Sequence, residues 1–346
     1  MIVYFSTVSR GASIDKGGEL IKLDWKNKKI IQKITIFPFD PQIHEDPNPR
    51  GNTRGGRGIL FSGGDLVVAT YHSLHIYDQD LNFKRKISHP LFVGLHEICK
   101  KQDLICVSAT AIDGVICVDT DGVLQESWWP RENDFLQKHL DIAPLSIDKS
   151  VDNRLRFLNG KHLASKSHLH LNAVAQEDGK LFALFGRRGL VYNLSDQKIT
   201  IENKGDFGFH NLVVSNNLIF TIHTRKRKLL IYNQKGSLVK AINLLKFKEV
   251  ADIYKKSGGP NYNLLRFFEY FRFARPIGKI GGFLSGQKAA ATLFVRGFHL
   301  LDRNRALIGF SPATIIEIDY EKEILLDFFQ YSEDISIAPH GLAALQ

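Results

Sequence analysis

The chain has 346 residues, 44% of them hydrophobic, and its 46 lysines and arginines against 36 aspartates and glutamates give a formal net charge of +10. A chain of this length and apolar content can bury a large core. No stretch approaches the roughly 18 consecutive apolar residues of a membrane-spanning helix, so no transmembrane segment is expected. The positive charge suits an anionic small molecule, a nucleic acid or an anionic membrane surface, and does not distinguish among them.

The first residues, MIVYFSTVSRG, lack a basic region followed by an apolar one. We therefore expect no signal peptide and a cytoplasmic location. The three cysteines, Cys99, Cys106 and Cys117, have no metal-ligand spacing. In a reducing compartment they are expected to be reduced, small and buried side chains.

An internal repeat runs along the chain, each copy consisting of an apolar run, a polar turn and a second apolar run. Segments 94–109 and 297–312 align without a gap, and 209–224 fits the same frame. Copies that start at Arg57 and His170 need one or two extra turn residues. A third apolar run follows each copy, at 74–78, 115–119, 190–194, 229–233 and 315–319. Such runs are typical of antiparallel strands, so the repeat is a meander of three or four strands.

The two ends of the chain complete one more copy. Residues 339–346 resemble a first strand without a second, and residues 2–25 resemble a second and third strand without a first. Pairing the termini would remove an open sheet edge. The sequence thus predicts an all-β fold, a six-bladed β-propeller over residues 1–346 that is closed between its N- and C-terminal strands.

Three connections exceed a bare blade of about 40 residues. These insertions span 36–56, 129–169 and 241–295, and all three are expected to cap the face where the inner strands begin. The last contains leucines and phenylalanines interleaved with arginines over 264–273, which predicts an amphipathic helix ending near Pro276. We expect a partly helical lid over the mouth of the channel. Peripheral membrane contact through 262–275 and a dimer surface remain as alternatives.

Histidines recur where the innermost strand of each unit begins. The six positions are Arg57, His96, His170 (or Asn172), His210, His299 and His340. Inner strands of a propeller converge on its axis, so these side chains should meet. Neutral imidazole is a common ligand of iron and zinc, and the five histidines are predicted to hold a divalent metal, Fe(II) in preference to Zn(II). Hydrogen bonding of each ring to a loop carbonyl remains the alternative.

Polar turns on the same mouth supply further candidates. The predicted catalytic set, which would orient an anionic group, is Arg57, His72, Arg187, Arg188 and His223. Guanidinium groups match carboxylate, sulfate or phosphate in bidentate geometry. Glu97 and Asp113 are the carboxylates expected to orient the imidazoles.

The six meander units closed between the termini resemble the propellers of strictosidine-synthase-like and arylsulfate-sulfotransferase-like proteins. The axial histidines are similar in plan to the multi-histidine iron site of carotenoid-cleaving oxygenases. The leading hypothesis is a metal-dependent oxygenase, lyase or hydrolase that acts on an anionic or aromatic small molecule. The resemblance to arylsulfate sulfotransferases implies a metal-free alternative with an axial histidine nucleophile. A non-catalytic binding scaffold is the third hypothesis, and a nucleic-acid partner is not expected because no known RNA-binding motif is present.

Overall fold

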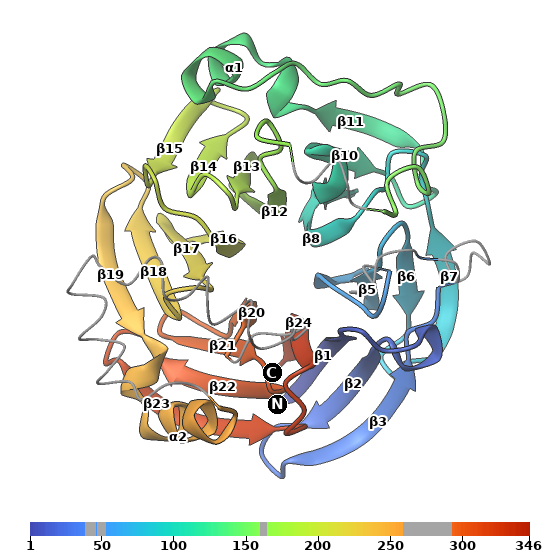
Figure 1. Cartoon of the computed structure of the whole chain (residues 1–346). Coiled ribbons are helices and arrows are strands. Elements are labelled where there is room, and N and C mark those ends of the chain that lie inside the picture. Colours follow the sequence, from blue (N-terminus) through green and yellow to red (C-terminus); the bar gives the residue numbers. More distant parts are fainter. Residues whose placement is uncertain (39–45, 47–52, 160–164, 259–292) are drawn as a thin grey trace.

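Six four-stranded antiparallel sheets surround one axis in the computed structural model, which describes residues 1–38, 46, 53–159, 165–258 and 293–346 (Figure 1). The predicted fold, an all-β propeller of six blades, is confirmed. Within each blade the strand that follows the connection from the preceding blade is innermost.

Five blades each take four consecutive strands from the chain. In chain order they are β4 (Ile59–Ser62), β5 (Asp65–Ala69), β6 (Leu74–Tyr77) and β7 (Phe83–Ile87); β8 (Leu95–Lys101), β9 (Leu104–Ala109), β10 (Gly114–Val118) and β11 (Leu124–Trp128); β12 (Leu171–Glu177), β13 (Lys180–Phe185), β14 (Leu190–Asn193) and β15 (Lys198–Glu202); β16 (Phe209–Ser215), β17 (Leu218–His223), β18 (Lys228–Asn233) and β19 (Leu238–Asn243); and β20 (Val295–Leu300), β21 (Arg305–Phe310), β22 (Thr314–Asp319) and β23 (Ile324–Gln330).

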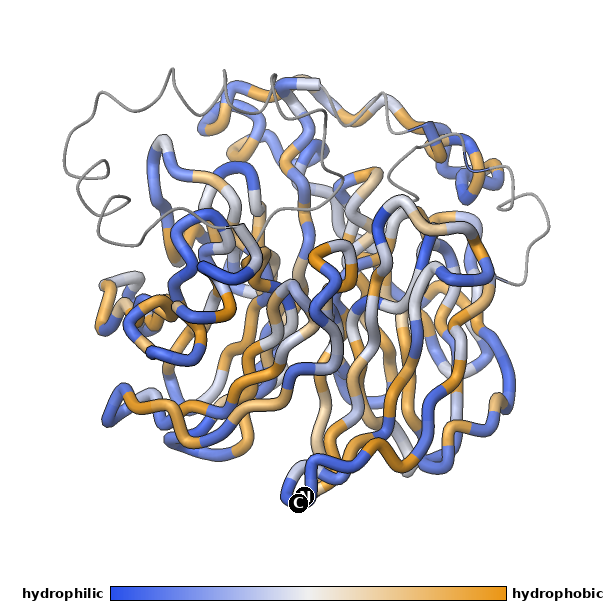
Figure 2. The backbone as a smooth tube through the Cα atoms, turned by 60° about the horizontal axis from the view of Figure 1, so that its bottom comes forward, coloured by the Kyte–Doolittle hydropathy of each residue, from blue (hydrophilic) through white to orange (hydrophobic). Residues whose placement is uncertain are grey.

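The sixth blade joins the two ends of the chain. Its order is β24 (Ile337–Leu345), β1 (Ile2–Ser9), β2 (Glu19–Asp24) and β3 (Lys29–Thr35). Ile2 lies opposite Leu345 in the ladder, and the two termini lie together at one end of the molecule (Figure 2). The predicted closure is therefore confirmed, and β24 covers the edge of β1.

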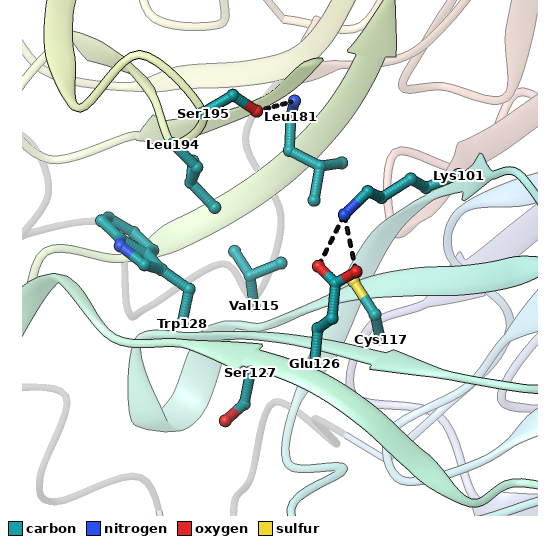
Figure 3. A pocket seen from close by; sticks show the side chains of 9 residues that line it. All are labelled: Lys101, Val115, Cys117, Glu126, Ser127, Trp128, Leu181, Leu194 and Ser195. Atoms are coloured by element: carbon teal, nitrogen blue, oxygen red, sulfur yellow. Dashed lines mark hydrogen bonds and ion pairs between the residues drawn. The ribbon is translucent and has the colours of Figure 1, made fainter. Parts of the chain in front are cut away.

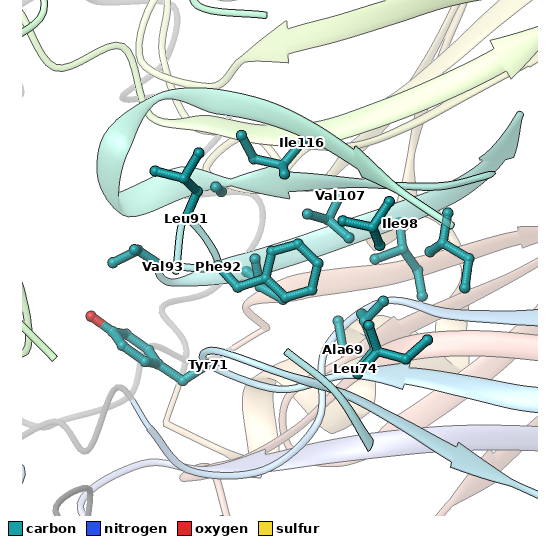
Figure 4. Packing of buried hydrophobic residues seen from close by; sticks show 14 of the residues in the cluster. Ala69, Tyr71, Leu74, Leu91, Phe92, Val93, Ile98, Val107 and Ile116 are labelled. Carbon is teal, nitrogen blue, oxygen red and sulfur yellow. The ribbon is translucent and has the colours of Figure 1, made fainter. Parts of the chain in front are cut away.

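The core lies between the blades rather than at the axis. Middle strands such as β10, GVICV, are buried at every position, whereas the outer strand β7, FKRKI, is exposed at four of five positions. A strand packed on both faces by neighbouring blades has to be apolar throughout. Leu74 and Phe92 belong to one such layer between adjacent blades (Figure 4). These layers hold the inner strands at fixed positions around the axis.

Both α-helices lie in predicted insertions. They are α1 (Asp134–Leu140) and α2 (Lys248–Lys256), and short 3-10 turns lie at Ile14–Lys16, Thr110–Ile112, Pro130–Glu132 and Leu244–Lys246. The predicted helix at 264–273 and the membrane-contact segment 262–275 lie outside the described residues. Of the helices that the structure describes, none has the length and apolar character needed to cross a membrane.

One expectation about the cysteines is wrong. The β9–β10 register places Cys106 directly opposite Cys117, and the two form a disulfide, while Cys99 on β8 is free. The sequence showed only their spacing of 11 residues, and the hairpin register was needed to reveal that they face each other. Disulfides persist in oxidising compartments, so the cytoplasmic location stays a prediction without support from this pair.

Candidate functional site

Five of the six inner strands have a register shift near their start, and the β4–β5 ladder has none. The equivalent position in each blade lies two residues before the first regular pair of the inner strand that follows any such shift. It is occupied in the six blades by Arg57, His96, Leu171, His210, Arg296 and His340. The fifth blade thus contributes Arg296 at the position expected for His299. A bulge commonly re-aims a side chain in this way.

The prediction that His299 joins the ring is corrected by this register. His299 pairs with Leu307 inside the β20–β21 ladder, and burial lowers its pKa to about 4. The gapless alignment matched Gly-Leu-His at 94–96 with Gly-Phe-His at 297–299. In the structure Gly94 precedes its strand, whereas Gly297 lies inside the bulge, so the alignment is shifted by three residues there.

The other four predicted histidines come together. The ring centre of His96 lies 5.7 Å from that of His170 and 5.5 Å from that of His340, and His170 lies 6.2 Å from His210. His170 precedes the equivalent position by one residue, which its left-handed backbone, φ 58°, accommodates. We call His96, His170, His210 and His340, together with Arg57, Arg296 and Glu97, the axial group.

Hydrogen bonds fix the proton on three of these rings. His96 Nδ1 donates to the Gly94 carbonyl at 3.1 Å, which leaves its Nε2 with a lone pair. The Asn172 amide donates to the Phe209 carbonyl at 2.9 Å and to His210 Nδ1 at 3.0 Å, so His210 carries its proton on Nε2. An arginine donor reaches the third ring, that of His340.

Arg296 Nη1 donates to His340 Nε2 at 3.1 Å, which places the His340 proton on Nδ1, 3.6 Å from Glu97 Oε1. A metal ligand needs a free lone pair, and those of His210 and His340 are already occupied. Among the described residues no three His, Cys, Asp or Glu side chains are placed to hold a metal ion. The axial group as arranged does not fit a multi-histidine metal site, and the Fe(II) or Zn(II) centre stays a prediction.

Burial sets the charges of the axial group. It lowers the pKa of each of the four imidazoles well below the usual 6.5, and the neighbouring guanidinium groups add to this effect. Burial also raises the pKa of Glu97 to about 8, although Arg296 and Arg57 oppose it, and lowers that of Arg57 to about 10. At neutral pH the group therefore holds two guanidinium cations, four neutral imidazoles and a protonated carboxyl.

Two carboxylates hold the axial side chains in place. Glu97 Oε1 accepts from Asn211 Nδ2 at 3.1 Å across the ring. Asp113 accepts from the main-chain N–H of Leu169 at 2.9 Å and of Leu171 at 3.1 Å, on either side of His170. Asp113 thus acts on the backbone that carries His170 rather than on its ring.

Replacing Asp113 by Ala is expected to lower the free energy of unfolding by about 3 kcal/mol, because two buried N–H groups lose their acceptor. Asn keeps one acceptor and tolerates the left-handed backbone of this residue, φ 53°. Asp113→Asn should therefore lower the free energy of unfolding by less than Asp113→Ala does. Urea denaturation measures both. Asp119→Ala, which removes the same kind of contact from an exposed turn, is the matched control, and an equal loss there would contradict this role.

The remaining predicted catalytic residues do not join the axial group. His223 is buried and bonds through Nε2 to Asp206 at 2.9 Å, which ties the end of β17 to the connection that precedes β16. His72 is also buried, and its carbonyl accepts from Ser88. Arg187 and Arg188 line a separate pocket with Phe207. Of this set only Arg57 lies in the axial group.

Arg296 was missed although the sequence held a signal for it. Arg57-Gly58, Arg296-Gly297 and His340-Gly341 share one pattern at the start of an inner strand. A Cβ at Gly341 would lie 2.0 Å from the Arg57 carbonyl, so the neighbouring strand leaves room only for glycine. A basic residue followed by glycine therefore occurs at three of the six inner-strand starts, although pairs such as Arg10-Gly11 and Arg188-Gly189 lie elsewhere in the chain.

Another cavity, of about 410 Å³, lies between the β8–β11 and β12–β15 blades (Figure 3). Its charged side chains neutralise each other, since Lys101 Nζ lies 2.6 Å from Glu126. Val115, Leu181 and Leu194 make the rest largely apolar. This cavity therefore offers no charge or nucleophile to compare with the axial group.

No protein-family model matches the chain, and no curated protein matches it in sequence. Its structure is similar to a protein of unknown function from Bacteroides caccae, with a TM-score of 0.55 and 8% identity over 99% of this chain and 97% of that one. A chain of a nidogen/laminin complex has a TM-score of 0.54 and 7% identity, over 98% and 97% of the chains. A streptogramin B lyase structure has a TM-score of 0.52 and 8% identity, over 98% and 86%. At these identities the likeness shows the β-propeller fold alone.

Proposed function

We propose that the chain is a metal-free enzyme that binds an anionic small molecule at the axial group and uses His96 as its base or nucleophile. The observation that carries this proposal is the placement of Arg57 and Arg296 within a ring of neutral imidazoles. Asp46 lies near Arg57 and also pairs with Arg54 Nη1 at 3.2 Å. Carboxylate, sulfate or phosphate would match two guanidinium groups.

Solvent access agrees with a binding role. His96, Glu97, His170 and Arg296 keep partial exposure, whereas Arg57, His210 and His340 are buried beneath them. A ligand that enters from solvent would meet the first four side chains. The deeper three would supply charge and N–H donors.

His96 and Glu97 suit complementary roles in group transfer. The Nε2 lone pair of His96 would form a bond to a sulfuryl, phosphoryl or acyl centre, while the bond to the leaving oxygen breaks. Glu97, protonated below about pH 8, would give its proton to that oxygen. Arg57 and Arg296 would stabilise the charge on the transferred group.

Calorimetry with sulfate, phosphate and benzoate tests the binding step. We expect Arg296→Gln to weaken anion binding at least tenfold, because a charge-assisted contact is lost. Arg305→Gln, in the same blade but paired with Asp302 and Glu317, is the matched control and should bind as the unmodified chain does.

Elemental analysis and turnover separate the competing functions. With nitrophenyl sulfate and phosphate as probes, His96→Gln should lose turnover and keep anion binding. Stoichiometric iron or zinc that disappears in His96→Ala would overturn the metal-free proposal in favour of a metal-dependent enzyme. Absence of both anion affinity and metal would leave the scaffold hypothesis.

A further inference from the structure

A pocket of about 390 Å³ lies on the same face as the start of the inner strands, outside the axial group. It is lined by His139 and Leu140 at the end of α1, by Arg187 and Arg188 in the β13–β14 turn, and by the connection 202–207 between β15 and β16. We call it the rim pocket. Its volume falls at the lower end of the range for small-molecule sites, roughly 300–1,000 Å³.

The two carboxylates of the rim pocket have basic partners of their own. Glu202 Oε1 lies 2.9 Å from His139 Nε2, and its other oxygen lies 4.0 Å from Lys204. Asp206 pairs with both His223 and Lys226. Among the described residues neither carboxylate forms an ion pair with Arg187 or Arg188.

The two arginines meet only neutral acceptors among the described residues. Arg187 Nη1 donates to the Ser165 carbonyl at 3.4 Å, and Arg188 Nη2 donates to the Lys166 carbonyl at 3.1 Å. Each guanidinium group has further N–H donors. The pocket thus presents two adjacent cations, Arg188 and Arg187, of which Arg187 is also attracted by the carboxylate of Asp113.

Aromatic surface accompanies these cations. Phe207 is 49% exposed, and the Arg225 guanidinium lies 3.9 Å from its ring centre. On the other side of the pocket the His139 ring stacks on Phe135, with ring centres 5.5 Å apart and planes at 15°. Flat rings at this entrance suit a flat ligand.

We propose that the rim pocket binds a planar aromatic small molecule that carries one anionic group. Arg187 and Arg188 bind the anionic group, and Phe207 packs against the ring system. The volume accommodates one or two fused rings. This site is distinct from the axial group and does not depend on the function proposed for it.

Calorimetry with 2-naphthoate, 2-naphthyl sulfate, 2-naphthyl phosphate and neutral 2-naphthol tests the proposal. Arg188→Met is expected to lower the affinity for each of the three anions at least tenfold and to leave the weak binding of 2-naphthol unchanged. Phe207→Leu should lower the affinity for all four probes, since every probe contains the ring system. The order among the three anions identifies which anionic group the pocket prefers.

Matched controls exist elsewhere on the surface. Arg85 also donates to a main-chain carbonyl, that of Thr120 at 2.6 Å, and Phe83 is 44% exposed, so Arg85→Met and Phe83→Leu should leave affinity unchanged. Circular dichroism verifies that every variant is folded. In Arg296→Gln the rim pocket should still bind the anionic probes. The proposal is overturned if Arg188→Met and Phe207→Leu bind all probes as the unmodified chain does, or if Arg296→Gln alone abolishes binding.

Discussion

A chain that ends at Ile337 is expected not to fold, because the deletion removes the inner strand β24. This strand pairs with β1 from Ile2↔Leu345 to Ser9↔Ile337 and buries Ala338, Leu342 and Ala343. Its loss would open the edge of β1 and the core layers on both sides. The whole stability of a domain is only about 5–15 kcal/mol, which is less than an inner strand of a closed ring contributes. Urea denaturation followed by circular dichroism should show no cooperative transition.

A circular permutant separates loss of the strand from a change of chain ends. Linking Gln346 to Met1 and opening the chain between Gly63 and Gly64 keeps every residue, and a Cβ at either glycine would meet nothing within 4 Å. The free energy of unfolding of this permutant should lie within about 1 kcal/mol of that of the unmodified chain, because permutations at exposed turns are commonly tolerated. A cooperative transition of normal midpoint in the truncated chain would show that β24 does not close the ring.

The free energy of unfolding is expected to be greatest near pH 6.5–7 and to fall steeply on the acid side. The pKa values of the four axial imidazoles are depressed by burial, so below pH 6.5 only the unfolded chain takes up these four protons. The folded chain holds one proton more than the unfolded chain on Glu97. These five groups alone give a difference of three protons, or about 4 kcal/mol per pH unit, and the depressed pKa values of the buried His75 and His299 make the whole acid limb steeper still.

On the alkaline side the sign reverses. The folded pKa of Glu97, about 8, lies above its ordinary 4.5, so between pH 6.5 and 8 the unfolded chain is ionised at this residue and the folded chain is not. Stability should fall there by about 1 kcal/mol per pH unit. Urea denaturation at half-unit intervals of pH measures both limbs.

Two variants test the assignment of these limbs. Glu97→Gln keeps an acceptor for Asn211 and should flatten the alkaline limb, while Glu126→Gln, at an exposed ion pair, should leave it unchanged. His96→Gln should reduce the slope of the free energy of unfolding against pH on the acid side by the contribution of one proton. An acid limb that keeps its slope in His96→Gln would mean that this imidazole is not held neutral.

The sequence alone determined the architecture of the ring. Runs such as VICVD at 115–119 and LLIYN at 229–233 recur with one spacing, and each can be buried only as a strand packed on both faces. The half-units at 2–25 and 339–346 complete each other and no other segment. Burial and strand period are local properties, so they can be recognised without the structure.

Only the tertiary structure decided which side chains meet. The period of two shows that residues alternate between faces, but a bulge or a turn one residue longer moves a side chain along the strand without changing that pattern. For this reason Arg296 occupies the position that was expected for His299. The register of the β9–β10 hairpin places Cys106 opposite Cys117. The sequence placed Arg187 and Arg188 on the correct face, yet the packing of α1 and the 202–207 connection put them in the rim pocket. Distances between blades depend on how six sheets pack around one axis, and no single segment of the sequence contains that information.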